Sequence, residues 1–472
     1  MLAVRERLAA DLRVRRLARR LGRGIDVERP LAPPSPVGAK LELTYRCNLK
    51  CPFCYTDSPR RTRERARDLD DAAWRAVVEE AVGLGVIEAV VTGGEPLLRR
   101  ELALELIERL CADGVGVTMN TNGWFVDGPT ADRLAAVAGF QANISIDGAT
   151  PELHDAARGV PGSWERAVEG VDRLLQRGAR VQVVHVVTPA NERFVPELLE
   201  VMWLLGVRSV RLAVAVPTGA AAREGDWRVD RGALRRRVAA AAERYPDLTI
   251  QVQPGTLAAL AAIEDVAPAA LLVRPNGTVW IDSVRPFGFG NVRDGGLAAC
   301  WGRIQERWND PQIVEWANAL PRADHIPASS VVPYLDEVAL EPEEPAEPAR
   351  AVERAAIPAG VPDTPRDGGD LAQARQRAVA LALGRRYCAG RCRSVGTADR
   401  YVRVLRDGRT CRLNRTASLI MDRCDGGTPA DAVAAVSARH PDLPLGSLEA
   451  ETLGSVRLLV ERGILEPALA RG

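Results

Sequence analysis

The sequence predicts an α/β protein built on a partial parallel barrel of six strand–helix units. Between Lys40 and Pro217, short β-branched runs alternate with amphipathic helical runs. This spacing is typical of right-handed crossovers between parallel strands. Several of the strand runs are nearly all apolar, as in a parallel sheet that is covered on both faces. Six units are too few to close an eight-stranded barrel, so we expect an open one.

The expected elements follow from these periodicities. Strands are expected at 41–44, 87–92, 116–119, 142–146, 181–187 and 210–216, and the clearest helices at 72–84, 101–112 and 164–177. After Pro217 the pattern loosens, and we expect a hairpin at 271–281 followed by a helix that contains Trp301. Residues 340–369 are rich in Pro, Glu and Ala, which is typical of a linker. Beyond residue 398, a hairpin and three amphipathic stretches predict a compact winged-helix-like unit.

We therefore divide the chain into four parts. These are an N-terminal amphipathic helix at 1–37, a core domain at 38–225, a small α+β extension at 226–398 and a C-terminal unit at 399–472. A targeting peptide is the alternative for the Arg-rich N-terminus, but its acidic residues are unusual in one. A length of 472 residues also predicts two or three domains.

Composition excludes several classes of protein. The 63 basic and 62 acidic residues leave a net charge of +1, which does not favour nucleic-acid binding. The sequence lacks an apolar run of about eighteen residues, so we expect no membrane span. Three of the nine cysteines fall between Cys47 and Cys54, and we find no export signal. This distribution indicates metal ligation in a reducing compartment, and we expect a cytoplasmic protein.

Unusual residues follow the first four expected strands. The cysteines follow the first strand, Gly93-Gly94-Glu95-Pro96 the second, Asn120-Thr121-Asn122-Gly123 the third, and Asp147-Gly148 the fourth. Parallel α/β folds place their chemistry at the carboxyl ends of the strands. We therefore expect these four segments to form one site.

The spacing of Cys47, Cys51 and Cys54 lets one loop bind three irons of a cubic iron–sulfur cluster. Such clusters usually take four thiolates, so a trio leaves one iron open to another ligand. The alternative is a zinc loop, which needs a fourth Cys or His, and none of the four histidines lies near. The Gly-Gly-Glu-Pro segment offers backbone acceptors and a negative charge to a ligand ammonium. The alternative for this segment is an ordinary strand-to-helix turn, which does not easily explain both motifs at adjacent strand ends.

Taken together, these motifs resemble the radical S-adenosylmethionine (SAM) superfamily over residues 38–220. The resemblance implies a [4Fe-4S] cluster on the three cysteines, whose open iron is chelated by the amino and carboxylate groups of SAM. One electron, from a donor such as a flavodoxin or ferredoxin, then cleaves SAM to a 5′-deoxyadenosyl radical. That radical abstracts a hydrogen atom from the substrate.

The same resemblance implies roles for further residues, with capping or core packing as the alternative role for each residue other than Glu95. Glu95 and the backbone of Gly93 and Gly94 would hold the methionine ammonium of SAM. Its carboxylate would meet Ser145 and Arg158. Asn120 and Asp147 are expected near the ribose of SAM, and Val186 and Val187 near its adenine. Phe53 and Tyr55 are expected beside the cluster.

The extension resembles the start of the SPASM or twitch modules that carry auxiliary iron–sulfur clusters. Ser283 stands where that family has a cysteine, and the expected Cys-x-x-Cys pair is missing. Cys388 and Cys392 resemble the closing cysteine pair of the module and, with Cys300, leave three ligands. We expect a degenerate extension without a cluster, and one auxiliary cluster is the alternative. The remaining cysteines are expected to be buried apolar thiols: Cys111, Cys411 and Cys424.

The C-terminal unit resembles the peptide chaperone of pyrroloquinoline-quinone biosynthesis, the PqqD-like recognition element. Its core is Leu413-Asn-Arg-Thr-Ala417 and Cys424-Asp-Gly-Gly-Thr428. From Arg400 onward, 11 basic and 9 acidic residues make a near-neutral surface, which argues against DNA binding. The resemblance implies that residues 399–472 bind the leader of a precursor peptide by strand addition. Tethering such a binder raises the effective concentration of substrate at the barrel.

The sequence thus predicts a radical SAM enzyme that modifies a ribosomally synthesised peptide. One alternative is a radical SAM enzyme that acts on a small molecule or cofactor precursor. Another is a non-catalytic peptide carrier with a structural cluster.

Overall fold

The computed structural model describes residues 32–58, 68–215, 219–222, 227, 229–253, 267–283, 287–313, 367–385, 387–389, 393–395, 401–404, 410–413, 415–441, 443–461 and 464–468. Most of the expected N-terminal helix and of the Pro/Glu-rich stretch lies outside these residues. Among the helices that the model describes, none has the length and hydropathy needed to cross a membrane.

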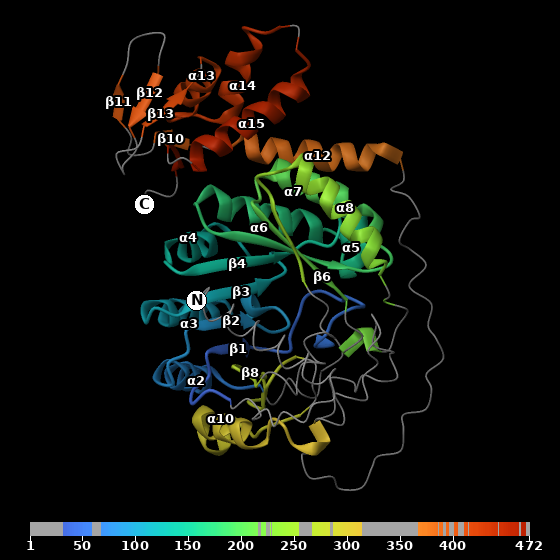
Figure 1. The fold of residues 1–472 in the computed structure, drawn as a ribbon, viewed down its shortest axis with the longest axis vertical. Coiled ribbons are helices and arrows are strands. Elements are labelled where there is room, and N and C mark those ends of the chain that lie inside the picture. Colours follow the sequence, from blue (N-terminus) through green and yellow to red (C-terminus); the bar gives the residue numbers. More distant parts are fainter. Residues whose placement is uncertain are drawn as a thin grey trace, which may run out of the picture.

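A curved nine-stranded sheet forms the centre of the molecule, in the order β7-β6-β5-β4-β3-β2-β1-β8-β9 (Figure 1). The six expected strands are confirmed as parallel neighbours in chain order. They are β1 (Gly38–Glu42), β2 (Glu88–Thr92), β3 (Gly116–Thr121), β4 (Phe140–Ser145), β5 (Val181–Val187) and β6 (Ser209–Val214). Their carboxyl ends therefore lie at one edge, as the sequence predicts. A seventh parallel strand, β7 (Thr249–Val252), extends the sheet beyond β6.

Helices connect the strands. The three helices expected from periodicity are confirmed as α2 (Asp71–Gly83), α3 (Arg100–Ala112) and α6 (Ser163–Gln176). The remaining connections carry α4 (Gly128–Ala136), α5 (Pro151–Arg158), α7 (Val195–Leu205) and α8 (Arg231–Arg244). α7 is apolar almost all round because a further helix, α12 (Asp367–Leu383), packs on its outer side. Such a helix lacks the polar stripe that makes amphipathic helices easy to recognise.

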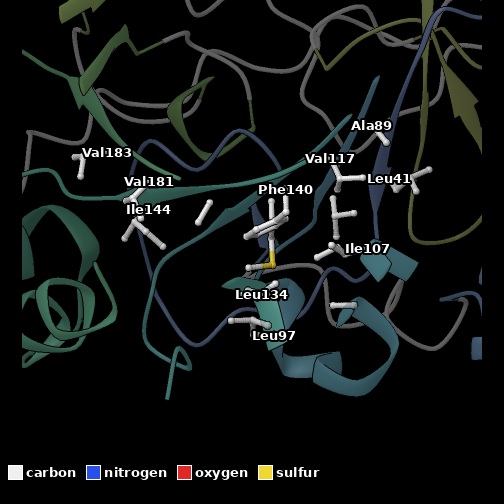
Figure 2. Packing of buried hydrophobic residues seen from close by; sticks show 14 of the residues in the cluster. Leu41, Ala89, Leu97, Ile107, Val117, Leu134, Phe140, Ile144, Val181 and Val183 are labelled. Atoms are coloured by element: carbon white, nitrogen blue, oxygen red, sulfur yellow. The ribbon is translucent and has the colours of Figure 1, made fainter. Parts of the chain in front are cut away.

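The apolar core lies between the helices and only one face of the sheet. Side chains alternate between the two faces of each strand, and the alternate residues that point into the core are fully buried. Figure 2 shows this packing of strand side chains against helix side chains, among them Leu41, Ala89, Val117, Ile144 and Val183 from the strands and Ile107 and Leu134 from α3 and α4. The expectation that both faces are covered by apolar contacts is therefore wrong. The opposite face, which we call the inner face, is largely polar.

The extension joins the main sheet rather than standing apart from it. The expected hairpin is confirmed as β8 (Ala270–Val273) and β9 (Val279–Trp280), but β8 pairs in parallel with β1. The following helix α10 (Gly296–Arg307) packs on α2, where Glu80 Oε2 accepts a hydrogen bond from Leu297 N at 2.6 Å. The chain thus returns to the first strand of the barrel after the sixth and seventh.

The C-terminal unit contains the expected hairpin, β12 (Tyr401–Val404) and β13 (Thr410–Leu413), and three helices. These helices are α13 (Arg415–Cys424), α14 (Pro429–Ser437) and α15 (Leu445–Glu461). Strand pairing extends the unit upstream of residue 399, because β11 (Arg393–Val395) pairs with β12. In addition, β10 (Tyr387–Ala389) pairs with the final strand β14 (Leu465–Pro467).

Two buried arginines fasten this unit to the barrel, and helix α12 lies between the unit and the barrel (Figure 1). Arg385, just after α12, donates from Nε to Asp172 Oδ1 on α6 at 2.7 Å and from Nη2 to the carbonyl of Leu205. Arg457 on α15 stacks over the Trp203 ring at 4.3 Å and donates to the carbonyl of Leu204 at 3.0 Å. The bound carbonyls lie in the last turn of α7, where a cation is electrostatically favoured.

The Arg385–Asp172 ion pair should contribute measurably to stability, because both side chains are nearly inaccessible to water, at 6% and 5% exposure. Asp172→Asn leaves the buried guanidinium without its counter-charge and should lower the free energy of unfolding by about 3 kcal/mol. Urea unfolding followed by circular dichroism measures this change. Glu105→Gln, which breaks the exposed Arg75–Glu105 pair, is the control and should leave stability nearly unchanged. Equal effects in the two variants would contradict the assignment.

Candidate active site

The three cysteines lie on one loop that follows β1 and is held from two sides. Lys50 N donates to the carbonyl of Arg158 at 2.9 Å, and Ala220 N donates to the carbonyl of Cys54 at 2.8 Å. Within the loop, Cys54 N donates to the carbonyl of Cys51 at 3.2 Å, which makes a tight turn between the last two thiols. All three thiols are free and partly exposed. The loop is therefore anchored on both sides, and its three cysteine residues are partly exposed.

The environment of two of these thiols, Cys47 and Cys51, opposes ionisation. Burial raises the pKa of Cys51 to about 11 and raises that of Cys47 further. Arg158 Nη1 lies 3.6 Å from Cys51 Sγ, and its positive charge acts in the other direction. Three thiols on one loop beside a fixed cation are a donor set that fits an iron–sulfur cluster, whose irons bind thiolates. In the described residues no three Cys, His, Asp or Glu side chains, these thiols included, converge on a single metal ion, whereas the thiolates of a cluster are shared among several irons.

Glu95 ties together the loops that follow β2 and β3. It is fully buried and caps the 3₁₀ turn Pro96–Arg99, accepting from Leu97 N at 3.1 Å. Its carboxylate also accepts from Thr121 Oγ1 at 2.7 Å and from Asn122 N at 2.8 Å. Asn122 Nδ2 then donates to Asn48 Oδ1 on the cysteine loop at 2.8 Å. The predicted role of Glu95 toward a ligand ammonium remains a prediction, and the structure gives this side chain a bonding role of its own.

Gly93 and Gly94 let the loop after β2 approach the cysteine loop. A Cβ atom on Gly94 would lie 2.2 Å from the carbonyl oxygen of Arg46, and one on Gly93 would lie 2.7 Å from that of Thr44. Gly93 also has a φ of +147°, which side chains disfavour. The close approach lets Gly94 N donate to the Thr44 carbonyl at 2.6 Å and Glu95 N to the Arg46 carbonyl at 2.8 Å. The glycines are thus required for packing between two backbone segments.

Asp147 and Arg158 form a buried ion pair next to the cysteine loop. Arg158 Nη2 lies 2.5 Å from Asp147 Oδ2, and both residues are at most 8% exposed. Asp147 Oδ1 accepts from Val186 N at 2.6 Å, while Asp147 N donates to Nδ1 of His154 at 3.0 Å. Burial lowers the pKa of His154 well below its usual value, which keeps the ring neutral and able to accept.

One buried hydrogen-bond donor of Arg158, its Nε, lacks a partner in the described part of the chain. Among the described residues, none offers an acceptor within hydrogen-bonding distance of its Nε. An orphaned, buried guanidinium N–H next to the cysteines fits a ligand carboxylate, because leaving such a donor unpaired is costly. This observation agrees with the predicted contact between Arg158 and the carboxylate of SAM.

The other predicted site residues do not all lie on the same face of the sheet. Asn120 Oδ1 accepts from Asn143 Nδ2 at 3.0 Å on the inner face, and Ser145 is partly exposed at the end of β4. Val186 is partly exposed, whereas Val187 points to the opposite face and is fully buried in the core. Since neighbouring strand residues face opposite sides, Val186 alone lies on the inner face. Phe53 lies 5.6 Å from the Arg158 guanidinium, beside the cysteine loop.

A polar cluster on the inner face was not predicted from the sequence. Tyr55, directly after the last cysteine, donates to Glu42 Oε1 at 3.0 Å. Lys40 Nζ lies 4.4 Å from the Tyr55 ring, 3.6 Å from Glu42 Oε1 and 2.6 Å from Ser283 Oγ. Charged residues two apart at the start of the first strand were the available signal, since Lys40 and Glu42 must share a face of β1.

The ligand set expected for an auxiliary cluster is not brought together. Cys300 is fully buried on α10, which packs on α2 near one end of the sheet. Cys388 lies on β10 in the C-terminal unit, beyond α12 at the other end (Figure 1). Cys392 lies outside the described residues. Of the cysteines predicted to be buried, Cys424 is buried and Cys111 is partly exposed, and the side chain of Cys411 lies outside the described part of the chain.

Comparison with known proteins agrees with this site. The radical SAM superfamily matches residues 41–212, and the family of coenzyme PQQ synthesis protein D (PqqD) matches residues 401–465. An AdoMet-dependent heme synthase from Oleidesulfovibrio alaskensis is 31% identical over 184 residues, which is 39% of this chain and 47% of that protein. A PqqA peptide cyclase from Methylocella silvestris is 33% identical over 187 residues, 39% of this chain and 48% of that protein. The chain thus spans about half the length of these curated relatives.

Among solved structures, Streptococcus suis SuiB bound to the precursor peptide SuiA has a TM-score of 0.50 at 16% identity. The match covers 63% of this chain and 71% of the SuiB chain, and it shows a likeness of fold alone. The parallel sheet and the three-cysteine loop define a radical SAM domain. Residues 41–212 thus form a radical SAM domain, and residues 401–465 form a PqqD domain.

The buried carboxyl of Glu95 predicts a specific pH dependence of stability. Burial raises its pKa from 4.5 to about 6, so the folded chain holds this proton more tightly than the unfolded chain. The resulting stabilisation is present below pH 4.5 and is lost as the pH rises through 6, a change of about 2 kcal/mol. Unfolding free energies of the wild type and Glu95→Gln between pH 4 and 7 measure it. The difference between the two proteins should change across this window, and a constant difference would contradict the prediction.

Proposed function

We propose that this chain is a radical SAM enzyme that modifies a ribosomally synthesised precursor peptide. The observation that carries the proposal is the joining, in one chain, of a radical SAM domain and a PqqD domain. A peptide-binding unit has an evident use beside a catalytic domain when the substrate is a peptide. One relative is named a PqqA peptide cyclase, which agrees with this proposal.

The [4Fe-4S] cluster on Cys47, Cys51 and Cys54 would supply the electron that cleaves SAM to a 5′-deoxyadenosyl radical, which takes a hydrogen atom from the substrate. The protein would bind and orient SAM and exclude water. The orphaned Nε of Arg158 would meet the carboxylate of SAM, with Ser145 nearby. Gly93, Gly94 and Glu95 would face its ammonium, and Asn120, Asp147 and Val186 the nucleoside.

Substrate delivery would use the PqqD domain. The leader of the peptide would pair with an edge strand of the β11–β12–β13 sheet, where backbone hydrogen bonds supply affinity. Since the domain is fastened to α6 and α7 by Arg385 and Arg457, binding there would hold the peptide near the barrel. A flavodoxin or ferredoxin in the cytoplasm is the electron donor that we propose.

A second candidate is a radical SAM enzyme for a small molecule or cofactor precursor. It is favoured by the likeness to a protein named AdoMet-dependent heme synthase. That likeness covers 39% of this chain, and the name of that protein does not account for the PqqD domain.

Replacement of single cysteines tests the cluster assignment. Cys51→Ala should remove the main cluster, so the iron of the anaerobically reconstituted chain should fall by about four atoms together with its visible absorbance. Cys388→Ala is the control and should leave total iron unchanged. Full iron content in Cys51→Ala would contradict the assignment. A loss of about four irons in Cys388→Ala would instead indicate an auxiliary cluster.

The peptide assignment is tested with short peptides encoded beside the gene. The reconstituted chain is incubated with SAM, dithionite and each peptide, and the products are analysed by mass spectrometry. We expect 5′-deoxyadenosine together with a mass change in one peptide. Release of 5′-deoxyadenosine with every peptide unbound and unmodified would favour the small-molecule candidate. No 5′-deoxyadenosine at all would favour a non-catalytic carrier.

A further inference from the structure

Arg211 is a cation on the inner face of the sheet without a counter-ion in the described part of the chain. It lies on β6 between Val210 and Leu212, both of which are fully buried in the apolar core. Because side chains alternate along a strand, Arg211 points to the opposite, inner face. Its Nε is buried and has no hydrogen-bond partner there, and burial lowers its pKa.

The neighbours of Arg211 on the adjacent strands are neutral. It stands opposite Val184 on β5 and Gln251 on β7. On the same face, Gln182 Nε2 donates to Ser209 Oγ at 2.8 Å. Amides and hydroxyls can border a bound anion, but they do not neutralise a guanidinium. Arg211 is partly buried, and burial of a charge is costly unless a partner compensates it.

The other inner-face cation, Lys40, differs because it is compensated. Glu42 Oε1 lies 3.6 Å from its ammonium, and Ser283 Oγ lies 2.6 Å away. Lys40 is on β1, which is far from β6 in the order of the sheet. Burial lowers the pKa of Lys40, and the positive charge of Arg211 acts weakly in the same direction. In the described part of the chain, Lys40 is thus a paired cation on the inner face, whereas Arg211 lacks a partner.

We propose that Arg211 is the anchor of a carboxylate-binding subsite on the inner face, which receives an acidic group of the substrate. A guanidinium offers a planar fork that binds a carboxylate through two hydrogen bonds. The subsite rests on the proposed function, since a peptide supplies carboxylates from acidic side chains and from its C-terminus. In this assignment Arg158 meets the carboxylate of SAM and Arg211 meets that of the substrate, so the two carboxylates have separate partners.

Three matched probes test the subsite by saturation-transfer difference NMR on the full chain, with the cluster reconstituted and oxidised and SAM at saturation. N-acetylglutamate α-amide carries a side-chain carboxylate, N-acetylglutamine carries an α-carboxylate, and N-acetylglutamine α-amide carries neither. We expect one of the acids to bind at least about tenfold more tightly than the neutral amide, as a charge-assisted contact requires. The acid that binds identifies the source of the carboxylate.

Arg211→Gln should abolish this preference, and Arg208→Gln is the matched control. Arg208 lies three residues away but is paired with Asp247 at 2.8 Å, so its loss should leave the preference intact. Arg211→Gln should also unfold at the same or a higher urea concentration than the wild type, because it removes an uncompensated charge. Two outcomes would overturn the subsite: equal binding of all probes, or a preference that survives in Arg211→Gln. Failure of the proposed function is separate, since it would appear as absent 5′-deoxyadenosine in the wild type.

Discussion

The geometry of the site depends on one buried carboxylate. Glu95 accepts hydrogen bonds from its own turn and from the segment after β3, and its backbone N–H is bound to the segment after β1. Three chain segments that are distant in sequence are thereby held in contact at the carboxyl edge of the sheet. The glycine pair before Glu95 permits this approach because any side chain there would collide with the backbone of the cysteine loop. The loop that carries the thiols is therefore positioned by its neighbours as much as by its own turn.

A second constraint is that one face of the sheet carries apolar side chains and the other carries mainly polar ones. Helices cover the outer face with apolar contacts, while Lys40, Glu42, Asn143, Gln182 and Arg211 occupy the inner face. In a parallel sheet with helices on both sides, such residues would have no solvation. The inner face is thus the surface on which polar ligands can be accommodated. The Tyr55–Glu42 hydrogen bond links it directly to the cysteine loop.

Much of the fold could be predicted because its signals are local. Six strands, three helices, the hairpin and the cysteine loop each depend on periodicity or spacing within a few residues. The rest depends on contacts between distant segments. Pairing of β8 with β1 spans more than two hundred residues, and the apolar sequence of α7 gives no sign that α12 covers it. Likewise, the motif that contains Arg158 does not reveal its ion pair with Asp147, and the burial of Val187 follows only from strand register.

The attachment of the C-terminal unit has a consequence for which residue of a peptide substrate could reach the active site. Arg385 and Arg457 bind α6 and α7 at defined positions, so the C-terminal unit is attached to the barrel by side-chain contacts as well as by the chain itself. If a leader docks on such a platform, the span from the dock to the thiols becomes a constant of the molecule. Only a residue that lies the right number of positions beyond the leader could then reach the radical. The position of a residue in the peptide relative to the leader would then determine which residue is modified. The identity of its side chain would be a second, separate criterion.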